Sequence, residues 1–422
     1  MPLAECMNKK QLCLGIFICA LGALFYCYEF ILRILPGILQ QPLSIAFGHL
    51  SASAFGQLSA LYYVAYSPMQ LPVGMFVDRF GTRKLLSIAC LCCVIGTWMF
   101  STFGSLPVAS CGRFIVGFGS SFVFVGVLSL AVEWLPKRYF SSFAGLMTTL
   151  GMLGLVYGEI TITHTAASMG LNYVFLVLIF LGIGLSGLLI FFLQDSPDKK
   201  KKSHLDLRSF FLQVTKVLCS KPVWIIGVIG ACLYTSLSVF GELWGNAYLQ
   251  QAHHLSAKQA ANTISLLFVG WAIGAPLSGF LSDYTGSQIL PLQISALGAL
   301  ICISIMLYIP ELSYSWVNAL MLLYGVFSGA EIIVFVMAKE YSGATLSGTV
   351  FAATNMIVTL GGVVFQPLVG MLLDYNQDSL VVVGERIYSV SDYHLALSIL
   401  PASLILSIIL AYFLKNKPVK SN

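Results

Sequence analysis

The chain alternates between long apolar runs and short polar stretches. A helix needs about 20 predominantly apolar residues to cross a bilayer, and twelve runs of this sequence have roughly that length or more. We predict spans at 12–35, 52–76, 84–103, 107–135, 140–165, 171–194, 222–249, 258–281, 289–309, 314–338, 346–373 and 394–414. Several are longer than a straight crossing requires, which indicates tilt. The pattern predicts an all-α membrane protein with twelve transmembrane helices.

Composition supports lipid as the solvent of this chain. Of 422 residues, 58% are hydrophobic and 9% are charged, whereas soluble domains carry about 25% charged residues. A soluble globule is therefore excluded. The net charge of +5 does not indicate nucleic acid as a partner, because the bases are spread over short loops with no basic domain.

The bases nevertheless predict an orientation. Lysine and arginine concentrate on the cytoplasmic side of membrane proteins. With both termini in the cytoplasm, that side holds 18 of the 22 bases, namely Lys9, Lys10, Arg79, Arg83, Lys84, Lys137, Arg138, Lys199 to Lys202, Arg208, Lys216, Lys221, Lys339, Lys415, Lys417 and Lys420. Lys9 and Lys10 precede a spanning run without a small-residue cleavage site, so the first span is expected to act as the insertion signal. We expect a multi-pass protein of the cytoplasmic (inner) membrane.

The eleven cysteines predict neither a metal site nor a disulfide framework. Most lie inside apolar runs, as Cys90, Cys92 and Cys93 do, without a His or carboxylate at ligand spacing. Buried cysteine behaves as a small hydrophobe, and an odd count argues against complete pairing. We expect no cofactor and no metal.

One long polar segment divides the chain. Residues 195–221 open with a charge run, Asp195 to Lys202, and continue with apolar positions at three- and four-residue spacing. That spacing predicts an amphipathic helix on the inner leaflet, in contact with membrane lipid. We predict an N-terminal half at 1–194, a linker at 195–221 and a C-terminal half at 222–422. We assign no role to the longest outer loop, at about 374–393.

A polar phrase recurs at half the chain length. Gly74-Met-Phe-Val-Asp78-Arg79-Phe-Gly81-Thr-Arg83-Lys84 is echoed by Gly279-Phe-Leu-Ser-Asp283-Tyr-Thr-Gly286 at an offset of 205 residues (283 − 78). Leu50-Ser51-Ala52 and Leu255-Ser256-Ala257 share that offset. The chain is therefore predicted to contain two related halves, each with the phrase after its second span.

The first phrase resembles the signature loop between spans two and three of the major facilitator superfamily of secondary transporters. The resemblance implies two six-helix halves and a monomer. It also implies a gating set, namely Gly74, Asp78, Arg79, Gly81, Arg83, Glu133 and Asp283. Asp78 is expected to face the N-terminus of span eleven, where the helix dipole favours an anion. Arg79 or Arg83 is expected to meet Glu133 as a latch on the inner gate.

Ionisable residues inside spans are candidates for function, because they are costly in lipid. Glu29 and Arg33 share a helical face in the first span; they form either a local ion pair or a solute and proton site. Arg113-Phe-Ile-Val-Gly117-Phe-Gly119 resembles the family's second motif, and Arg113 either binds solute or braces the bundle.

Glu331 in span ten is the second choice for a proton carrier after Glu29. Glu159 and Glu242 fall near the outer ends of their spans and are interpreted as interfacial. Further solute-binding candidates are Tyr28, Asn355 and Gln366.

The sequence favours transport over catalysis. It has no P-loop, HExxH or GxSxG motif, so an energy-coupled carrier of this kind would use an ion or solute gradient. Two embedded arginines favour an anion, because guanidinium binds carboxylate bidentately. We therefore predict a non-enzymatic carrier of organic-anion type, with proton symport of a small carboxylate, an amino acid or peptide, or a polycarboxylate siderophore. The alternatives are a drug or siderophore efflux antiporter and a transport-dead nutrient sensor.

Overall fold

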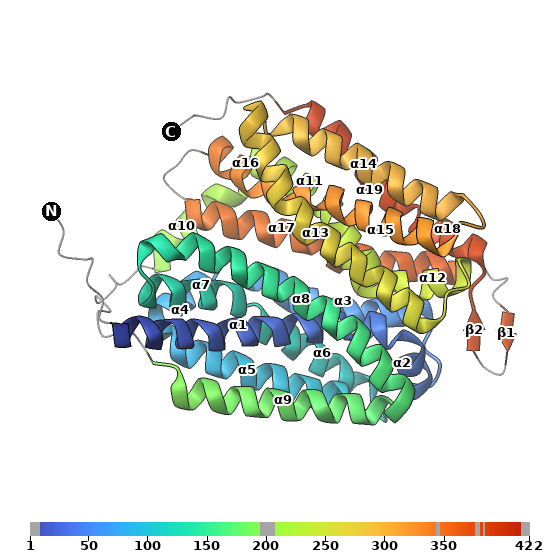
Figure 1. Ribbon diagram of the computed structural model, residues 1–422, viewed down its shortest axis with the longest axis horizontal. Helices are drawn as coiled ribbons and strands as arrows, with labels where there is room; N and C mark the ends of the chain where they lie inside the picture. Colours follow the sequence, from blue (N-terminus) through green and yellow to red (C-terminus); the bar gives the residue numbers. More distant parts are fainter. Residues whose placement is uncertain (1–8, 195–206, 343–346, 376–379, 383–384, 415–422) are drawn as a thin grey trace.

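A computed structural model describes residues 9–194, 207–342, 347–375, 380–382 and 385–414. The first half of the chain forms one helical bundle (Figure 1). Its helices are α1 (Lys9–Ile38), α2 (Gln40–Ala46), α3 (Ala52–Met69), α4 (Val73–Phe80), α5 (Thr82–Phe100), α6 (Leu106–Ser120), α7 (Val123–Trp134), α8 (Lys137–Met169) and α9 (Leu171–Phe192).

The second half forms another bundle above the first in Figure 1. Its elements are α10 (Leu207–Leu218), α11 (Lys221–Thr235), the π-helical η1 (Ser236–Trp244), α12 (Gly245–Ala252), α13 (Ala257–Thr285), α14 (Ile289–Tyr308), α15 (Tyr314–Ser328), the 3₁₀-helical η2 (Gly329–Ile332), α16 (Ile333–Ser342), α17 (Ser347–Tyr375), α18 (Val390–Leu397) and α19 (Ile399–Tyr412). A small antiparallel hairpin pairs β1 (Leu380–Val382) with β2 (Glu385–Ile387).

The predicted all-α fold with twelve spans is confirmed. In the described part of the chain, eleven helical stretches are long and apolar enough to cross a membrane. The remaining predicted span, the second, is divided into α3 and α4. Pro68 and Pro72 flank the break, and proline removes a helical donor and kinks the helix. The predicted amphipathic helix after the charge run is α10; the charge run itself lies outside the described residues.

The repeated phrases have the same structural roles in both halves. Ser51 caps α3 by accepting a bond from the Ala54 amide, and Ser256 forms a capping box with Gln259 at the start of α13. A serine before the first helical turn satisfies amides that have no partner within the helix. At the other end of each repeat, Gly81 and Gly286 have φ of +83° and +62°, which glycine adopts without strain. The repeat therefore specifies where the second span of each half begins and how the chain turns after it.

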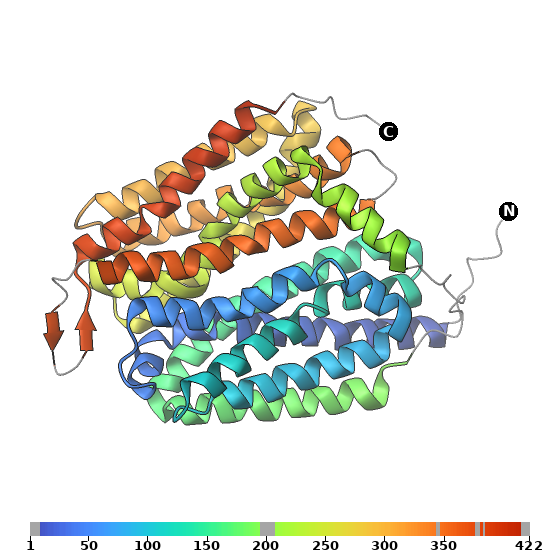
Figure 2. The same cartoon turned by 180° about the vertical axis from the view of Figure 1, so that it is seen from behind.

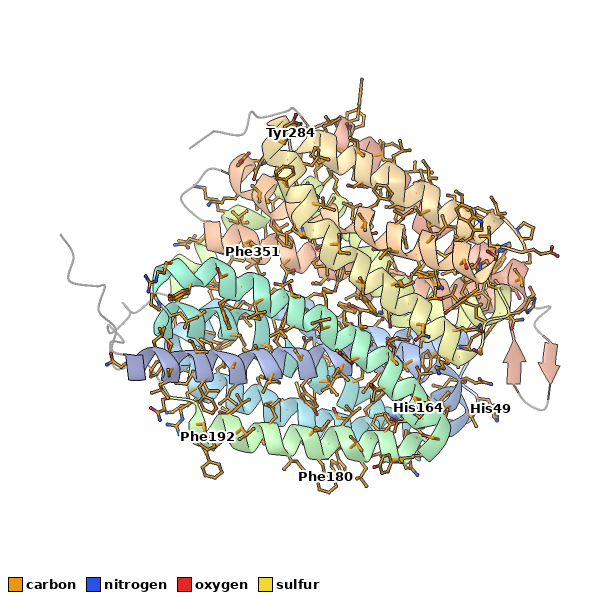
Figure 3. The ribbon with its side chains drawn as sticks, in the orientation of Figure 1. His49, His164, Phe180, Phe192, Tyr284 and Phe351 are labelled. Carbon is orange, nitrogen blue, oxygen red and sulfur yellow. The ribbon has the colours of Figure 1, made fainter. Side chains whose placement is uncertain are left out.

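The bundle has two opposite ends, the terminal face and the hairpin face. The terminal face holds the start of α1, at the left of Figure 1, and the end of α19, at its top; the hairpin face holds α2, α12 and the β-hairpin, at the right. Large apolar side chains such as Phe180 and Phe192 project from the outer surface of the bundle (Figure 3). Such a surface suits lipid, in which apolar side chains need no polar cover.

The most extensive contacts between the halves are those of α3 with α17, α8 with α13, and α1 with η1. Figure 2 shows α3 and α17 side by side from behind. The backbones of the two halves approach too closely for a side chain at two glycines. A methyl group added at Gly370 would lie 2.3 Å from the Ala52 carbonyl oxygen, and one added at Gly37 would lie 2.2 Å from the Glu242 carbonyl oxygen. Small residues permit such close packing between membrane helices.

Candidate functional site

The ion pair of Arg33 and Glu29 lies in the middle of the molecule. Nη2 of Arg33 is 2.6 Å from Oε1 of Glu29, and Nε is 3.2 Å from the same oxygen. The side chains of this ion pair are 5% (Arg33) and 1% (Glu29) exposed. The four-residue spacing on α1 puts both groups on one face, as predicted. Such a pair, removed from water, is stable only if its remaining polar atoms also find partners.

Aromatic side chains supply several of those partners. The Tyr62 hydroxyl of α3 donates to the same oxygen of Glu29 and accepts a bond from Nε of Arg33 at 3.1 Å. The guanidinium carbon of Arg33 lies 4.4 Å from the ring centre of Phe30 and 5.1 Å from that of Tyr66. A desolvated cation near an aromatic ring is attracted by the electron density of the ring face. The first half therefore surrounds Arg33 with one carboxylate and three rings.

The same arginine also reaches the second half. Nη1 of Arg33 donates to the Tyr234 hydroxyl of α11 at 3.1 Å. Tyr63 of α3 donates to Glu242 of η1, and Tyr234 lies 3.5 Å from the other oxygen of Glu242. These contacts form the central network, which consists of Glu29, Arg33, Tyr62, Tyr63, Tyr234 and Glu242. Because its members come from both halves, any movement of one half against the other must break some of these bonds.

Glu242 corrects an interpretation made from the sequence. We placed it near the outer end of a span as an interfacial residue, but its side chain is 3% exposed and faces the central network. The π-helical segment Ser236–Trp244 carries it, and short π-helical insertions occur often at functional sites. The rule that flagged Glu29, that an ionisable group inside a span is a candidate, applies equally to Glu242. Tyr234 carried no such signal.

Arg113 has a different environment. Its Nη1 donates to the Leu32 carbonyl at 2.8 Å, its Nη2 to the Arg33 carbonyl at 2.7 Å, and its Nε to the Ser59 carbonyl at 3.4 Å. The Leu32 carbonyl lacks its normal helical donor, because residue 36 is proline and has no amide hydrogen. In this conformation Arg113 of α6 therefore donates to the carbonyl that Pro36 leaves without a helical partner, which is a bracing contact between α6 and α1.

This arrangement gives a prediction about stability. Arg113→Ala should lower the free energy of unfolding by on the order of 3 kcal/mol, because it removes buried charge-assisted hydrogen bonds to backbone carbonyls and leaves the Leu32 carbonyl without a donor. Thermal unfolding of the purified, ligand-free protein measures the effect. Arg138→Ala, at an exposed position, is the control and should change stability by less than about 0.5 kcal/mol. Equal melting temperatures for both variants would contradict the bracing role.

The remaining solute-binding candidates do not join the central network. Tyr28 donates to the Leu178 carbonyl of α9 at 3.0 Å, and Gln366 donates to the Ser238 carbonyl at 2.6 Å. Asn355 of α17 donates to Gln70 at 2.9 Å, a contact that joins the halves. Glu331 is buried at 5% exposure in η2, apart from the network contacts described above. The structure thus brings Glu29 and Arg33 together and places Arg113 against the backbone of Arg33, whereas Tyr28, Asn355 and Gln366 bond partners outside the central network.

The arginines of the signature turn make local contacts. Arg83 donates to the Ile190 carbonyl of α9 at 3.0 Å, and Arg79 lies against the ring of Phe80. Glu133 accepts a bond from Thr82, the residue just before Arg83, at 3.0 Å. Gly74 and Asp283 lie on exposed faces of α4 and α13. The expected partner of Asp78, the N-terminus of α17, borders residues 343–346, which are outside the described residues.

A related contact occurs on the hairpin face. Asp374, near the end of α17, accepts bonds from the amides of Ala52 and Ser53 at 3.3 and 2.8 Å. An acid at a helix N-terminus is favourable because of the helix dipole. Tyr388 bonds both the Ala52 amide and Asp374, at 2.9 and 2.6 Å. Asp374 and Tyr388, at the two ends of the outer loop to which we assigned no role, therefore join α17 and the segment before α18 to the start of α3 on the hairpin face.

Comparison with known proteins agrees with this fold. Residues 12–366 match the model of the Major Facilitator Superfamily. The "Probable sulfoacetate transporter" of Cupriavidus necator is 26% identical over 56% of this chain and 57% of its own length. The "Lysosomal dipeptide transporter" of Danio rerio is 25% identical over 68% of this chain and 64% of its own length. The chain thus matches less than two thirds of each of these relatives.

A crystal structure of a bacterial homolog of the human lysosomal transporter Spinster, in an inward-facing and unoccupied conformation, superimposes with a TM-score of 0.72. The two chains are 18% identical, and the match covers 96% of this chain and 97% of the other. At that identity the likeness concerns the fold. Together with the family match over residues 12–366, these findings show that the chain belongs to the Major Facilitator Superfamily of membrane transporters.

Proposed function

We propose that this protein is a proton-coupled secondary transporter of a small organic anion, and that Arg33 binds the anionic group. The observation that carries the proposal is the position of Arg33, which bonds Glu29 in its own half and Tyr234 in the other. A planar guanidinium holds a carboxylate or sulfonate through parallel N–H bonds. In the described conformation Tyr234 and Glu29 occupy donors of Arg33, so the solute would replace bonds that the halves now make with each other.

Charge balance connects the solute to the proton. As long as Glu29 is ionised, it neutralises Arg33 in a site with little water. When Glu29 takes up a proton, the positive charge of Arg33 has lost its partner, and an uncompensated buried charge is costly. An anionic solute restores neutrality, so proton and anion each favour the binding of the other. This reciprocity corresponds to symport.

The moving units proposed are residues 1–194 and 222–422, joined by 195–221. Rocking of two halves around a site near the membrane midplane is a general mode of transport for carriers with internal repeats. We propose a monomer in the cytoplasmic membrane with both termini inside, in accordance with the distribution of lysine and arginine. The terminal face would then be cytoplasmic and the hairpin face external.

Counterflow in proteoliposomes tests the solute class. Vesicles loaded with one compound and exposed to a labelled trace of the same compound should accumulate label transiently for carboxylates, sulfonates or acidic dipeptides. Neutral sugars and cationic amines should produce no counterflow. Exchange of a neutral or cationic compound, with none for any anion in the panel, would show that the anion assignment is wrong.

A further inference from the structure

A second buried carboxylate, Glu159 of α8, joins the two halves near the hairpin face. Its Oε1 accepts a bond of 2.6 Å from the Asn246 side chain of α12. Asn246 also lines a cavity of about 590 Å³ that lies between the halves on this face. The side chain of Glu159 is 0% exposed, although the sequence had suggested an interfacial residue. Glu159 is thus enclosed by the contact between the halves, and its partner Asn246 lines the cavity.

No positive charge compensates Glu159. Its second oxygen, Oε2, is buried without a hydrogen-bond partner among the described residues, and no Lys, Arg or His of the described chain lies at ion-pair distance from it. The ionisable groups of the elements packed around it have other surroundings. Glu29 and Arg33 of α1 bind each other, and Tyr248 of α12 and His253 at its C-terminal cap both bond the Met306 carbonyl. Glu133 of α7 lies near the terminal face. The other ionisable groups are exposed, namely Lys258 and Asp283 of α13, His164 of α8 and Tyr173 of α9.

An ionised carboxylate in such a place would be unfavourable. One neutral amide donor does not replace the water that a charged carboxylate loses on burial. The protonated form is neutral, and it still accepts the Asn246 bond through its carbonyl oxygen. We propose that Glu159 is a proton-binding site of the closed hairpin face, so that a proton bound here favours contact between α8 and α12.

The direction of the effect follows from linkage. Separation of α8 from α12 exposes Glu159 to water, where the carboxylate is stable and the proton is released. The closed face binds this proton more tightly than the open face, so low pH favours closure and high pH favours opening. For one proton, the ratio of closed to open molecules changes by up to about tenfold per pH unit.

The inference rests on the proposed function only in that the halves move against each other. It requires no solute and no role for Glu29. Distances between spin labels at Gln41 of α2 and Lys258 of α13, both exposed on the hairpin face, therefore test it in detergent without any solute. The labels are placed in a background without other reactive cysteines, and the fraction of molecules with the short distance is measured from pH 5 to pH 9.

The native side chain at position 159 should give a closed fraction that rises as the pH falls. Glu159→Gln, which is permanently neutral, should remain closed with at least a severalfold weaker dependence on pH. Glu159→Asp keeps an ionisable group and should keep the dependence. Glu311→Gln, at an exposed position near the same face, is the matched control and should behave as the parent.

Two results would overturn the inference. One is a closed fraction that does not change with pH in the parent protein; this measurement does not depend on whether any variant at position 159 folds. The other is a Glu159→Gln variant with the full dependence of the parent, since the titrating group would then lie elsewhere.

Discussion

Replacement of Arg33 by lysine is expected to weaken solute binding by about tenfold, and replacement by glutamine by about a hundredfold or more. Charge-assisted hydrogen bonds contribute about 1.5–3 kcal/mol each, and a tenfold change in affinity corresponds to about 1.4 kcal/mol. Lysine keeps the positive charge but loses the fork that can bond two oxygens of an anion. Glutamine loses both. Solute-dependent thermal stabilisation and counterflow rates measure these effects.

The control for Arg33 must separate binding from folding. Arg33→Gln alone leaves Glu29 as a buried charge without its partner, which destabilises the empty protein. The double variant Glu29→Gln/Arg33→Gln removes both charges and should recover most of the stability while binding stays weak. If Arg33→Gln retains the full solute-induced stabilisation, Arg33 is only the partner of Glu29, and the anion-binding role is excluded.

Glu29→Gln is expected to abolish accumulation driven by a pH gradient while it preserves solute exchange. Exchange needs no net proton movement, so a permanently neutral side chain permits it. With one proton per solute, a gradient of one pH unit supports an accumulation of up to about tenfold; the variant should reach a ratio of about one. Uptake and counterflow in the same proteoliposome preparation give both quantities.

Three further glutamate variants complete this experiment. Glu311→Gln, at an exposed position, should accumulate solute as the parent does. Glu242→Gln and Glu331→Gln test the two buried glutamates of the second half. If Glu29→Gln accumulates solute normally and one of these two does not, coupling belongs to that residue instead.

The sequence by itself determined the class of the protein, the number of its spans and the family. These properties depend on local features: the length of an apolar run, the charge density of a turn, and a phrase repeated at an offset of 205 residues. The repeat also has a local structural meaning, because Ser51 and Ser256 cap helices and Gly81 and Gly286 adopt positive φ. The i, i+4 spacing of Glu29 and Arg33 was sufficient to predict that they share a face.

The tertiary structure decided which polar groups meet. Hydropathy gives the approximate depth of a residue along a span but not the helix that it faces, so Glu159 and Glu242 were both interpreted as interfacial. Their partners, Asn246 and Tyr63, are 87 and 179 residues away in the chain. The distinction between Arg33 and Arg113 has the same origin. Both are embedded arginines in the sequence, but Arg113 meets backbone carbonyls, among them the Leu32 carbonyl freed by Pro36, whereas Arg33 meets a carboxylate and the other half. A side chain in lipid takes the partner that helix packing brings to it, and that partner is set by contacts between residues far apart in sequence.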